Sequence, residues 1–390
     1  MKVLFVGEYS GAYKDLIAYM KTQKIKVMWI HDGDSYKKLK GADFSIKYKK
    51  LTSDIFFISV LLKIYYLLLD FMGLKGLVQI LRYNKIIDQL SDFDVVQLVN
   101  TKPLGEFSSL ANIYFLNKIF KNNSKVFLSA LGDDYTWVKS CLDRDFKYSS
   151  FDRMNMKNLY MYSWSMLYLY GLGYKKLDNL VMNNVCGIIP GLYDYYYAYE
   201  NKKNPKLKKI IPIAVEIKDF EKIKDKDKDK DKVYPIKIFH GWQKNKELKK
   251  GNDIFHSAII RLKEKYPEKI SYEVVSGLSY NEYITKFRDC DVFIDQCYSM
   301  DMGVNALLGM ASGKVVLSGF EEEVKNYYLV KNINIAINAL PDENTIYNEI
   351  ENLILNPELI NLYSENALNF MKKYHSPDYV LSEYFKVWKA

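Results

Sequence analysis

Residues 303–319 read GVNALLGMASGKVVLSG, and this stretch decides the fold class that the sequence predicts. It combines a glycine turn, a helix of small and apolar residues, a second glycine turn and a continuous apolar strand. Small residues let a backbone approach a ligand closely, and the N–H groups of a helix N-terminus attract phosphate. The stretch therefore predicts a helix start that faces an anionic ligand and consists of Gly303, Val304, Asn305 and Ala306.

The same alternation of apolar strands and helices runs through both halves of the chain. In the first half we expect strands at 2–7, 26–34, 94–100, 125–134, 185–191 and 209–215. In the second half we expect strands at 236–242, 269–279, 291–296, 314–319 and 332–337, and three helices close the chain. Continuous apolar strands between helices are typical of a parallel sheet covered on both faces. The sequence predicts an α/β fold of two Rossmann-like, doubly wound domains that face each other across a cleft.

The alternating Asp and Lys residues of 219–233 predict a boundary between the two domains. Such a segment has nothing to bury, so it is typical of a solvated linker. We expect a first domain over 1–218, the charged linker over 219–233 and a second domain over 234–375. The remaining helix, 376–390, is expected to pack back on the first domain.

The composition excludes several classes of function. The net charge is +9, but only five of the 56 basic residues are arginine, and no nucleic-acid reader motif is present, so we do not predict nucleic-acid binding. The four histidines and four cysteines are scattered, so no metal site is predicted. The chain starts directly with a strand pattern and shows no signal peptide, so we expect a cytoplasmic protein.

Two tracts rich in apolar and aromatic residues, 55–82 and 158–176, have two interpretations. Lys63 and Asp70 interrupt the first tract, so it falls short of a membrane-spanning segment. Each tract suits either a buried core helix or a helix that lies in a membrane interface. The second interpretation predicts peripheral contact with the inner face of the cell membrane, near a lipid-linked acceptor.

Three segments of the second half occur in an order known from one family: KKGNDIFHSAIIRL (249–262), YNEYITKFRDCDVFIDQ (280–296) and GVNALLGMASGKVVLSG (303–319). In this respect the chain resembles the two-domain GT-B glycosyltransferases, and most closely their retaining class, family 4 (glycosyl transferases group 1). The resemblance is strongest over 236–323 and extends more loosely to FVGEYSGAYKDLIAYM, DVVQLVN and LSALGDDYTW in the first half. It implies an acceptor-binding first domain and a second domain that binds a nucleotide sugar, such as a UDP- or GDP-sugar, as substrate. It also implies retention at the anomeric carbon and no metal or other cofactor.

The resemblance assigns Lys250, beside Gly251, to the lysine that neutralises the departing diphosphate. The arginine that usually accompanies it is absent, so Lys244 or Lys246 would replace it with a point charge. Either lysine could also be a solvated side chain of the turn. The further donor-binding residues that we expect are loop residues after strands: Gly241, Gly277, Asp295 and Gln296, the last two holding a sugar hydroxyl.

The family's two glutamates, eight residues apart, fall on Met300 and Leu308 in this chain. Neither side chain can accept a hydrogen bond as a carboxylate does. We therefore expect Glu321 or Glu323 to replace the missing carboxylate. The alternative is that these glutamates are only the solvated start of a helix.

In the first domain, two loops at the carboxyl ends of strands are expected near the ligands. Gly7 and Gly11 follow the first strand and are assigned to the donor side. Asp134 is a candidate catalytic carboxylate that orients an acceptor hydroxyl, and it is equally a candidate N-cap for the next helix.

The sequence predicts a glycosyltransferase that moves a sugar from a nucleotide-sugar donor to a hydroxyl of a glycan or lipid-linked glycan, in bacterial surface polysaccharide synthesis. The alternative is a catalytically silent homologue that binds a sugar nucleotide or glycan and supports a partner enzyme. Met300 and Leu308 favour the alternative, whereas Lys250 and the glycine turn at Gly303 favour the enzyme.

Overall fold

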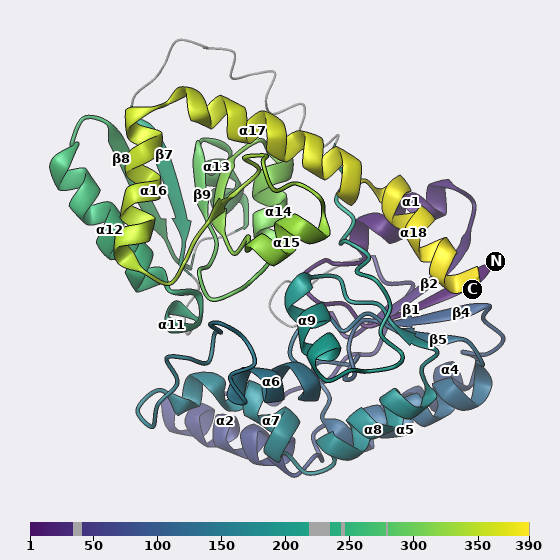
Figure 1. Ribbon diagram of the computed structural model, residues 1–390. Helices are drawn as coiled ribbons and strands as arrows, with labels where there is room; N and C mark the ends of the chain where they lie inside the picture. Colours follow the sequence, from purple (N-terminus) through teal and green to yellow (C-terminus); the bar gives the residue numbers. More distant parts are fainter. Residues whose placement is uncertain (34–40, 218–234, 243–245, 278–279, 390) are drawn as a thin grey trace.

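The computed structural model describes residues 1–33, 41–217, 235–242, 246–277 and 280–389. The charged linker predicted at 219–233 and the candidate Lys244 lie outside these residues, so the domain boundaries stay predictions. The described residues form two parallel sheets, each wrapped by helices, as the sequence predicted (Figure 1).

The first sheet has six strands in the order β3-β2-β1-β4-β5-β6, and all neighbours run parallel. The strands are β1 (Lys2–Val6), β2 (Lys26–His31), β3 (Phe44–Ser45), β4 (Val95–Leu98), β5 (Val126–Leu128) and β6 (Gly187–Ile188). The helices are α1 (Lys14–Thr22), α2 (Phe56–Phe71), α3 (Leu77–Ile80), α4 (Asn84–Asp88), α5 (Ser109–Asn122), α6 (Tyr135–Leu142), α7 (Ser163–Tyr170), α8 (Tyr174–Asn184) and α9 (Tyr193–Asn201), with short 3-10 helices η1 (Leu81–Tyr83) and η2 (Leu159–Tyr162).

Side chains that alternate along the strands bury both faces of this sheet. Leu4 and Val6 of β1 join one core with α5 and α8, whereas Val3 and Phe5 join the other core with α1. An all-apolar strand such as β1 satisfies both faces at once, which explains why KVLFV carries no polar alternation.

The second sheet has five parallel strands in the order β11-β10-β9-β7-β8. The strands are β7 (Ile236–Gly241), β8 (Ile270–Val275), β9 (Val292–Ile294), β10 (Val315–Ser318) and β11 (Ile337–Asn338). The helices are α11 (Glu247–Lys250), α12 (Asn252–Lys265), α13 (Tyr280–Arg288), α14 (Val304–Ala311), α15 (Glu322–Tyr327), α16 (Glu343–Leu355), α17 (Glu358–Phe370) with the π-helix η3 (Met371–His375), and α18 (Pro377–Lys389).

The last helix, α18, lies against the first sheet, far from the strands that precede it in the sequence (Figure 1). The indole Nε1 of Trp388 donates a hydrogen bond of 3.1 Å to Oε1 of Gln97 on β4, and its ring meets Phe5 of β1. Helix α18 therefore ties the end of the chain to the first sheet.

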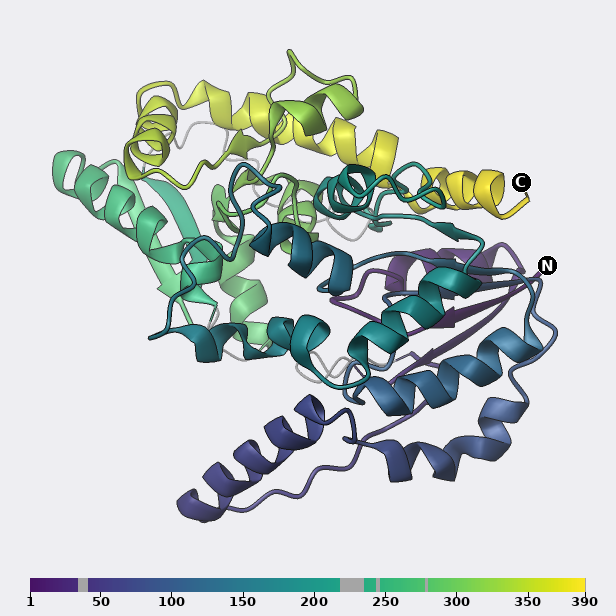
Figure 2. The same cartoon turned by 60° about the horizontal axis from the view of Figure 1, so that its bottom comes forward.

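Two expectations are wrong. Residues 209–215 do not form the predicted strand, and the Val215 N–H instead donates a hydrogen bond of 2.8 Å to His375 O. Pro212 has no N–H to donate to the hydrogen-bond ladder of a sheet. The buried-core interpretation of the 55–82 tract is also wrong for its main helix, α2, because Asp70 is the single buried residue of that helix. That helix projects from the body of the molecule (Figure 2).

Candidate functional site

The site begins with a buried ion pair at the carboxyl edge of the second sheet. The Lys250 ammonium, at the end of α11, lies 2.7 Å from Oδ1 of Asp295, which follows β9. The Asp295 side chain is only 3% exposed and that of Lys250 is 14% exposed. The structure thus brings together two residues that are 45 positions apart and that the sequence singled out separately.

Gly251 makes this pairing sterically feasible. It has φ +73, and a Cβ atom at this position would lie 2.2 Å from Sγ of Cys297. The close approach sets the carbonyl of Lys250 against the exit of β9, where it accepts a 3.0 Å hydrogen bond from the Cys297 N–H. Gly251 is therefore required by packing and by backbone conformation.

The N-terminus of α14 meets the same ion pair. Gly303 is its N-cap, and a Cβ there would lie 3.3 Å from Oδ2 of Asp295 and 3.6 Å from Nε2 of Gln296. Within the described residues, no side chain caps this helix start. Val304 and Asn305 are partly exposed, and Ala306 is buried.

An uncapped helix start beside an ammonium is chemically suited to an anion. The first N–H groups of a helix have no intrahelical partner, and the helix dipole adds partial positive charge there. The Lys250 ammonium has three N–H donors, of which Asp295 takes one. The edge formed by Lys250, Asp295, Gln296 and Gly303 can therefore bind a phosphate and, through Asp295, a hydroxyl group; we call these four residues the β9 edge.

The two positions that correspond to the family's glutamates hold apolar side chains, which cannot accept a hydrogen bond from a ligand hydroxyl as a carboxylate does. Met300 is buried, with 6% exposure, and Leu308 is partly buried against the core. The missing carboxylates are therefore replaced by apolar packing at both positions.

Glu321 does not replace them in the predicted way. It is buried rather than solvated, and its Oε1 accepts hydrogen bonds from Tyr148 Oη and, at 3.0 Å, from Asn338 Nδ2. Lys147 lies 3.7 Å from its Oε2. Because Tyr148 and Lys147 belong to the first domain, Glu321 joins the two domains. Glu323 is exposed, in agreement with the alternative that these glutamates are the solvated start of a helix.

The first-domain candidates also have structural roles. Asp134 is the N-cap of α6: its Oδ1 accepts the Trp137 N–H at 2.8 Å, and its Oδ2 accepts Tyr199 Oη at 2.8 Å. Burial raises its pKa to about 7. With both oxygens engaged and no exposure, Asp134 does not face an acceptor, so the N-cap alternative describes it and the catalytic assignment does not.

The loop after β1 already contains an anion. The buried Glu8 carboxylate accepts hydrogen bonds of 3.0, 2.7 and 3.0 Å from the N–H groups of Gly11, Ala12 and Tyr13. Gly7, with φ +85, is needed because a Cβ would lie 2.4 Å from Pro103 O. The glycines of this loop therefore serve close packing and internal capping, which argues against the predicted donor contact of Gly7; Gly11 has open space around its Cβ position.

Three further candidates lie at loops, and one of them touches the β9 edge through its backbone, since the Lys246 carbonyl accepts the Lys250 N–H at 3.0 Å. Gly241 ends β7 beside Tyr283, Lys246 is exposed at the start of α11, and Gly277 is exposed after β8 with φ +70. Their donor-binding assignments stay predictions.

Sequence reasoning missed a chain of polar contacts that crosses between the domains. Lys249 Nζ of α11 donates to Ser165 Oγ of α7 at 3.4 Å, and Ser165 Oγ donates to Oδ2 of Asp133. Burial lowers the pKa of Lys249. The lysine also lies 4.5 Å from the ring centre of Tyr162. No local motif signals such a contact, because its members come from three separate segments.

A second interdomain contact consists of two buried carboxyl groups, Asp194 and Asp301. Asp194 accepts the N–H groups of Met300 and Asp301 at 3.0 and 2.9 Å, and Asp301 accepts the Tyr193 N–H at 2.8 Å. Burial raises the pKa of Asp194 to about 6 and that of Asp301 to about 7. This contact fixes the loop that leads into α14.

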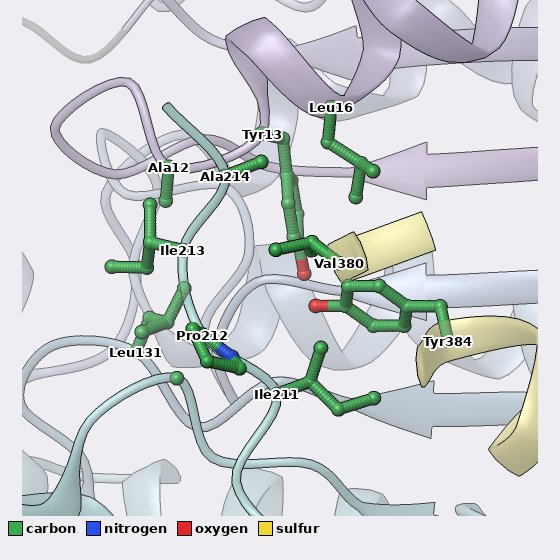
Figure 3. A pocket seen from close by; sticks show the side chains of 11 residues that line it. Ala12, Tyr13, Leu16, Leu131, Ile211, Pro212, Ile213, Ala214, Val380 and Tyr384 are labelled. Atoms are coloured by element: carbon green, nitrogen blue, oxygen red, sulfur yellow. The ribbon is translucent and has the colours of Figure 1, made fainter. Parts of the chain in front are cut away.

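A cavity of about 10 Å³ lies elsewhere, between α1, α18 and the 211–214 segment (Figure 3). Tyr13, Ile213, Val380 and Tyr384 line it. It has room for about one water molecule, so it is not a ligand site. Among the described residues, no group of three or more His, Cys, Asp or Glu side chains is placed to hold a metal ion.

The solved structures that are similar to this chain include three that cover nearly all of it. The Anabaena protein HepE, in complex with UDP and glucose, has a TM-score of 0.59 and 11% identity, with 100% of both chains covered. Sucrose-phosphate synthase from Thermosynechococcus elongatus has a TM-score of 0.61 and 10% identity, covering 100% of this chain and 98% of its own. A glycosyltransferase from Rickettsia africae has a TM-score of 0.50 and 14% identity, covering 99% and 97%.

These identities are low, so the likeness concerns the fold. No protein-family model and no curated protein matches the sequence. Two helix-covered parallel sheets, matched over their full length by these structures, establish that the chain has the GT-B fold of glycosyltransferases.

Proposed function

We propose that this protein is a glycosyltransferase that transfers a sugar from a nucleotide sugar to a hydroxyl group. One observation carries the proposal: Lys250, Asp295 and the uncapped start of α14 converge at the carboxyl edge of the second sheet. Ligands of doubly wound sheets bind at this edge. HepE, which shares the fold, was solved with UDP and with UDP-glucose, and this supports a UDP-sugar as the donor.

In this proposal the β9 edge stabilises the leaving group. The bond between the anomeric carbon and the diphosphate oxygen breaks while the acceptor hydroxyl forms the new glycosidic bond, and the proton of that hydroxyl passes to the departing diphosphate. Negative charge grows on the diphosphate, where Lys250 and the N–H groups of α14 interact with it most strongly. In this proposal Oδ2 of Asp295, which faces Gly303, accepts a sugar hydroxyl.

The finer parts of the proposal rest on the sequence resemblance. They are a retaining, family-4-like reaction, a glycan or lipid-linked glycan as acceptor, and a role in bacterial surface polysaccharide synthesis at the cytoplasmic face of the membrane. No catalytic base is assigned, because Asp134 is occupied as an N-cap.

A second candidate function is that of a silent homologue, which binds a sugar nucleotide and supports a partner enzyme. The apolar side chains of Met300 and Leu308, at the positions of the family's glutamates, favour it. It differs from the enzyme in one respect that can be measured: the donor would bind without turnover.

Thermal unfolding with UDP, GDP and their sugars tests donor binding. A ligand at about 100 times its dissociation constant stabilises the native state by about 2.7 kcal/mol, and we expect this for UDP-sugars. Lys250→Ala should abolish the shift, whereas Lys263→Ala, which changes an exposed lysine of α12, should preserve it. No shift with any nucleotide, or an equal shift in Lys250→Ala, would overturn the assigned site.

Release of UDP from the bound donor then separates the two functions. Turnover upon addition of a glycan or lipid-linked acceptor supports the enzyme. Tight donor binding without any release of UDP, across acceptors, supports the silent homologue.

A further inference from the structure

Helix α2 is exposed along most of its surface, and only one face, which includes Ser59, Leu62, Tyr66 and Leu69, is partly covered. Of its 16 residues only Asp70 is buried. Phe56 and Phe57 at its start are 74% and 76% exposed, and Leu61 is 64% exposed. The helix extends away from the body of the molecule (Figure 2). A helix that is apolar on all sides is expected inside a core or a membrane, so this one lacks its partner in the isolated chain.

The exposed apolar area continues beyond the helix. We call it the α2 surface; it comprises Ile55, Phe56, Phe57, Ile58, Leu61, Ile64, Tyr65, Leu67, Leu68, Phe71, Met72, Leu74, Val78 and Leu81. The neighbouring η2–α7 region adds the exposed side chains of Leu159, Tyr160, Trp164, Tyr170 and Leu172. The two regions adjoin, because the Leu172 N–H donates to Phe71 O at 2.7 Å. A continuous apolar patch of this kind marks an interaction site.

The helix is anchored at specific points. Lys75 forms a 2.5 Å ion pair with Asp70, and both side chains are buried. Tyr66 accepts a 2.6 Å hydrogen bond from the Leu51 N–H. These two contacts are local to the α2 segment, and its end is tied to α5 because the Ser108 N–H donates to Lys75 O and the Leu110 N–H donates to Gly73 O, both at 3.1 Å. The exposure of the apolar side chains of α2 is therefore a property of the folded chain.

The charges around the α2 surface indicate what covers it. From Lys47 to Lys85 the chain has seven basic and two acidic residues, and one residue of each kind, Lys75 and Asp70, forms the buried ion pair. Lys47, Lys49 and Lys63 are exposed. Anionic lipid headgroups attract such lysines, while apolar and aromatic side chains enter the acyl boundary.

A second protein chain fits this surface less well. Lysine is depleted in protein–protein interfaces, yet Lys63 lies in the middle of the apolar helix. At a bilayer its stem can lie along the apolar phase while the ammonium reaches the headgroups. Tyr65, Tyr160 and Trp164 have the amphipathic rings that favour the same boundary. Within the described part of the chain, no helix is long and apolar enough to cross a membrane, so α2 would lie in the interface plane.

We propose that the α2 surface docks this protein on a bilayer rich in anionic phospholipid. Helix α7 links that surface to the site, since its Trp164 is exposed beside α2 while the adjacent Ser165 is buried and contacts Lys249. One consequence rests on the proposed function: docking would then bring the β9 edge toward a lipid-linked acceptor. The docking itself does not depend on that function.

Vesicle flotation of the full chain tests the docking without any nucleotide or acceptor. The probes are vesicles of phosphatidylcholine alone and of equal parts phosphatidylcholine and phosphatidylglycerol. One variant combines Phe57→Ser, Leu61→Ser and Leu68→Ser, which change exposed side chains only. The matched control, Leu329→Ser with Leu355→Ser, changes exposed leucines of the second domain.

We expect the wild type and the control to float with the anionic vesicles and the α2 variant to remain at the bottom. Lys47→Gln, Lys49→Gln and Lys63→Gln together should weaken partitioning on the order of a hundredfold, from about 1 kcal/mol per lysine near the surface. Added salt should weaken wild-type binding as well, because it screens the lysines.

Equal flotation of the wild type and the α2 variant would overturn the proposal. A second result would also overturn it: the wild type binds neither kind of vesicle and sediments as a dimer, whereas the α2 variant sediments as a monomer. The α2 surface would then be an interface between two copies of this chain. Either result leaves donor binding at the β9 edge untouched, since flotation is measured without donor. Failure of the proposed function would, conversely, leave flotation unchanged.

Discussion

The buried pair Lys250–Asp295 allows a sharp prediction, because its two partners differ in their access to water. Lys250→Met removes the ammonium but keeps most of the stem volume. It leaves the Asp295 carboxylate 3% exposed, with Ser318 Oγ, at 3.4 Å, as its remaining side-chain partner in the described structure. Breaking a buried pair in this way costs about 3–5 kcal/mol of unfolding free energy.

The reverse change should cost less. Asp295→Asn leaves a lysine that is already 14% exposed and has a flexible stem, so its ammonium can turn toward water. We expect a loss of about 1–2 kcal/mol. The double variant Lys250→Met with Asp295→Asn buries no unpaired charge, so it should be more stable than Lys250→Met alone by about 2 kcal/mol.

Urea unfolding of the four proteins at neutral pH gives the required free energies from their midpoints and slopes. The exposed pair Lys237–Asp289 is the matched control, and breaking it should change stability by less than about 1 kcal/mol. The reasoning is refuted if the double variant loses the sum of the two single losses, because the two residues would then not interact in the folded state.

Three further predictions concern packing, the last helix and pH. Gly251→Ala should lower the free energy of unfolding by about 2–4 kcal/mol, since its φ is +73 and the new Cβ meets Cys297 Sγ. In urea unfolding, the additional change Cys297→Ala should recover only the part of this loss that comes from the clash, because the strain of the positive φ remains. Trp388→Ala should cost about 3–5 kcal/mol, because the side chain is 2% exposed and bonded to Gln97; an unchanged urea midpoint would mean that α18 does not hold the first sheet. Burial raises the pKa of Asp301 to about 7, above its value of about 3.9 in the unfolded chain. Between these two values the native state keeps a proton that the unfolded chain releases. The stability that this protonation contributes is therefore lost as the pH rises through about 7. Asp301→Asn should therefore flatten the fall of the urea midpoint between about pH 4 and 7, and an unchanged slope would contradict this.

The strands and the helices around them could be predicted from local pattern. No tertiary information was needed to predict strands at the apolar runs 2–7 and 236–242, because burial on both faces of a sheet demands continuous apolar residues. The first helix likewise follows from the helical spacing of Leu16, Ile17 and Met20. The segment 209–215 could not be predicted correctly from its local pattern. Its apolar residues are buried, but a strand also needs hydrogen bonds to a neighbouring strand, and Pro212 has no N–H to donate.

The exposure of α2 could not be predicted either. Its composition suits a core helix and an interfacial helix equally well, since both are rich in apolar residues. The choice depends on whether another element covers the helix, and that is a property of the fold.

The sequence by itself determined the α/β class, the two sheets and the glycine turns at Gly251 and Gly303, because backbone geometry and apolar periodicity are local. Only the tertiary structure decided the roles of the carboxylates. Asp134 caps a helix, Glu321 joins the domains and Asp295 holds Lys250. The physical reason is that a carboxylate has the same chemistry in each place, and its partners, brought from distant segments, determine whether that chemistry stabilises the fold or remains available to a ligand.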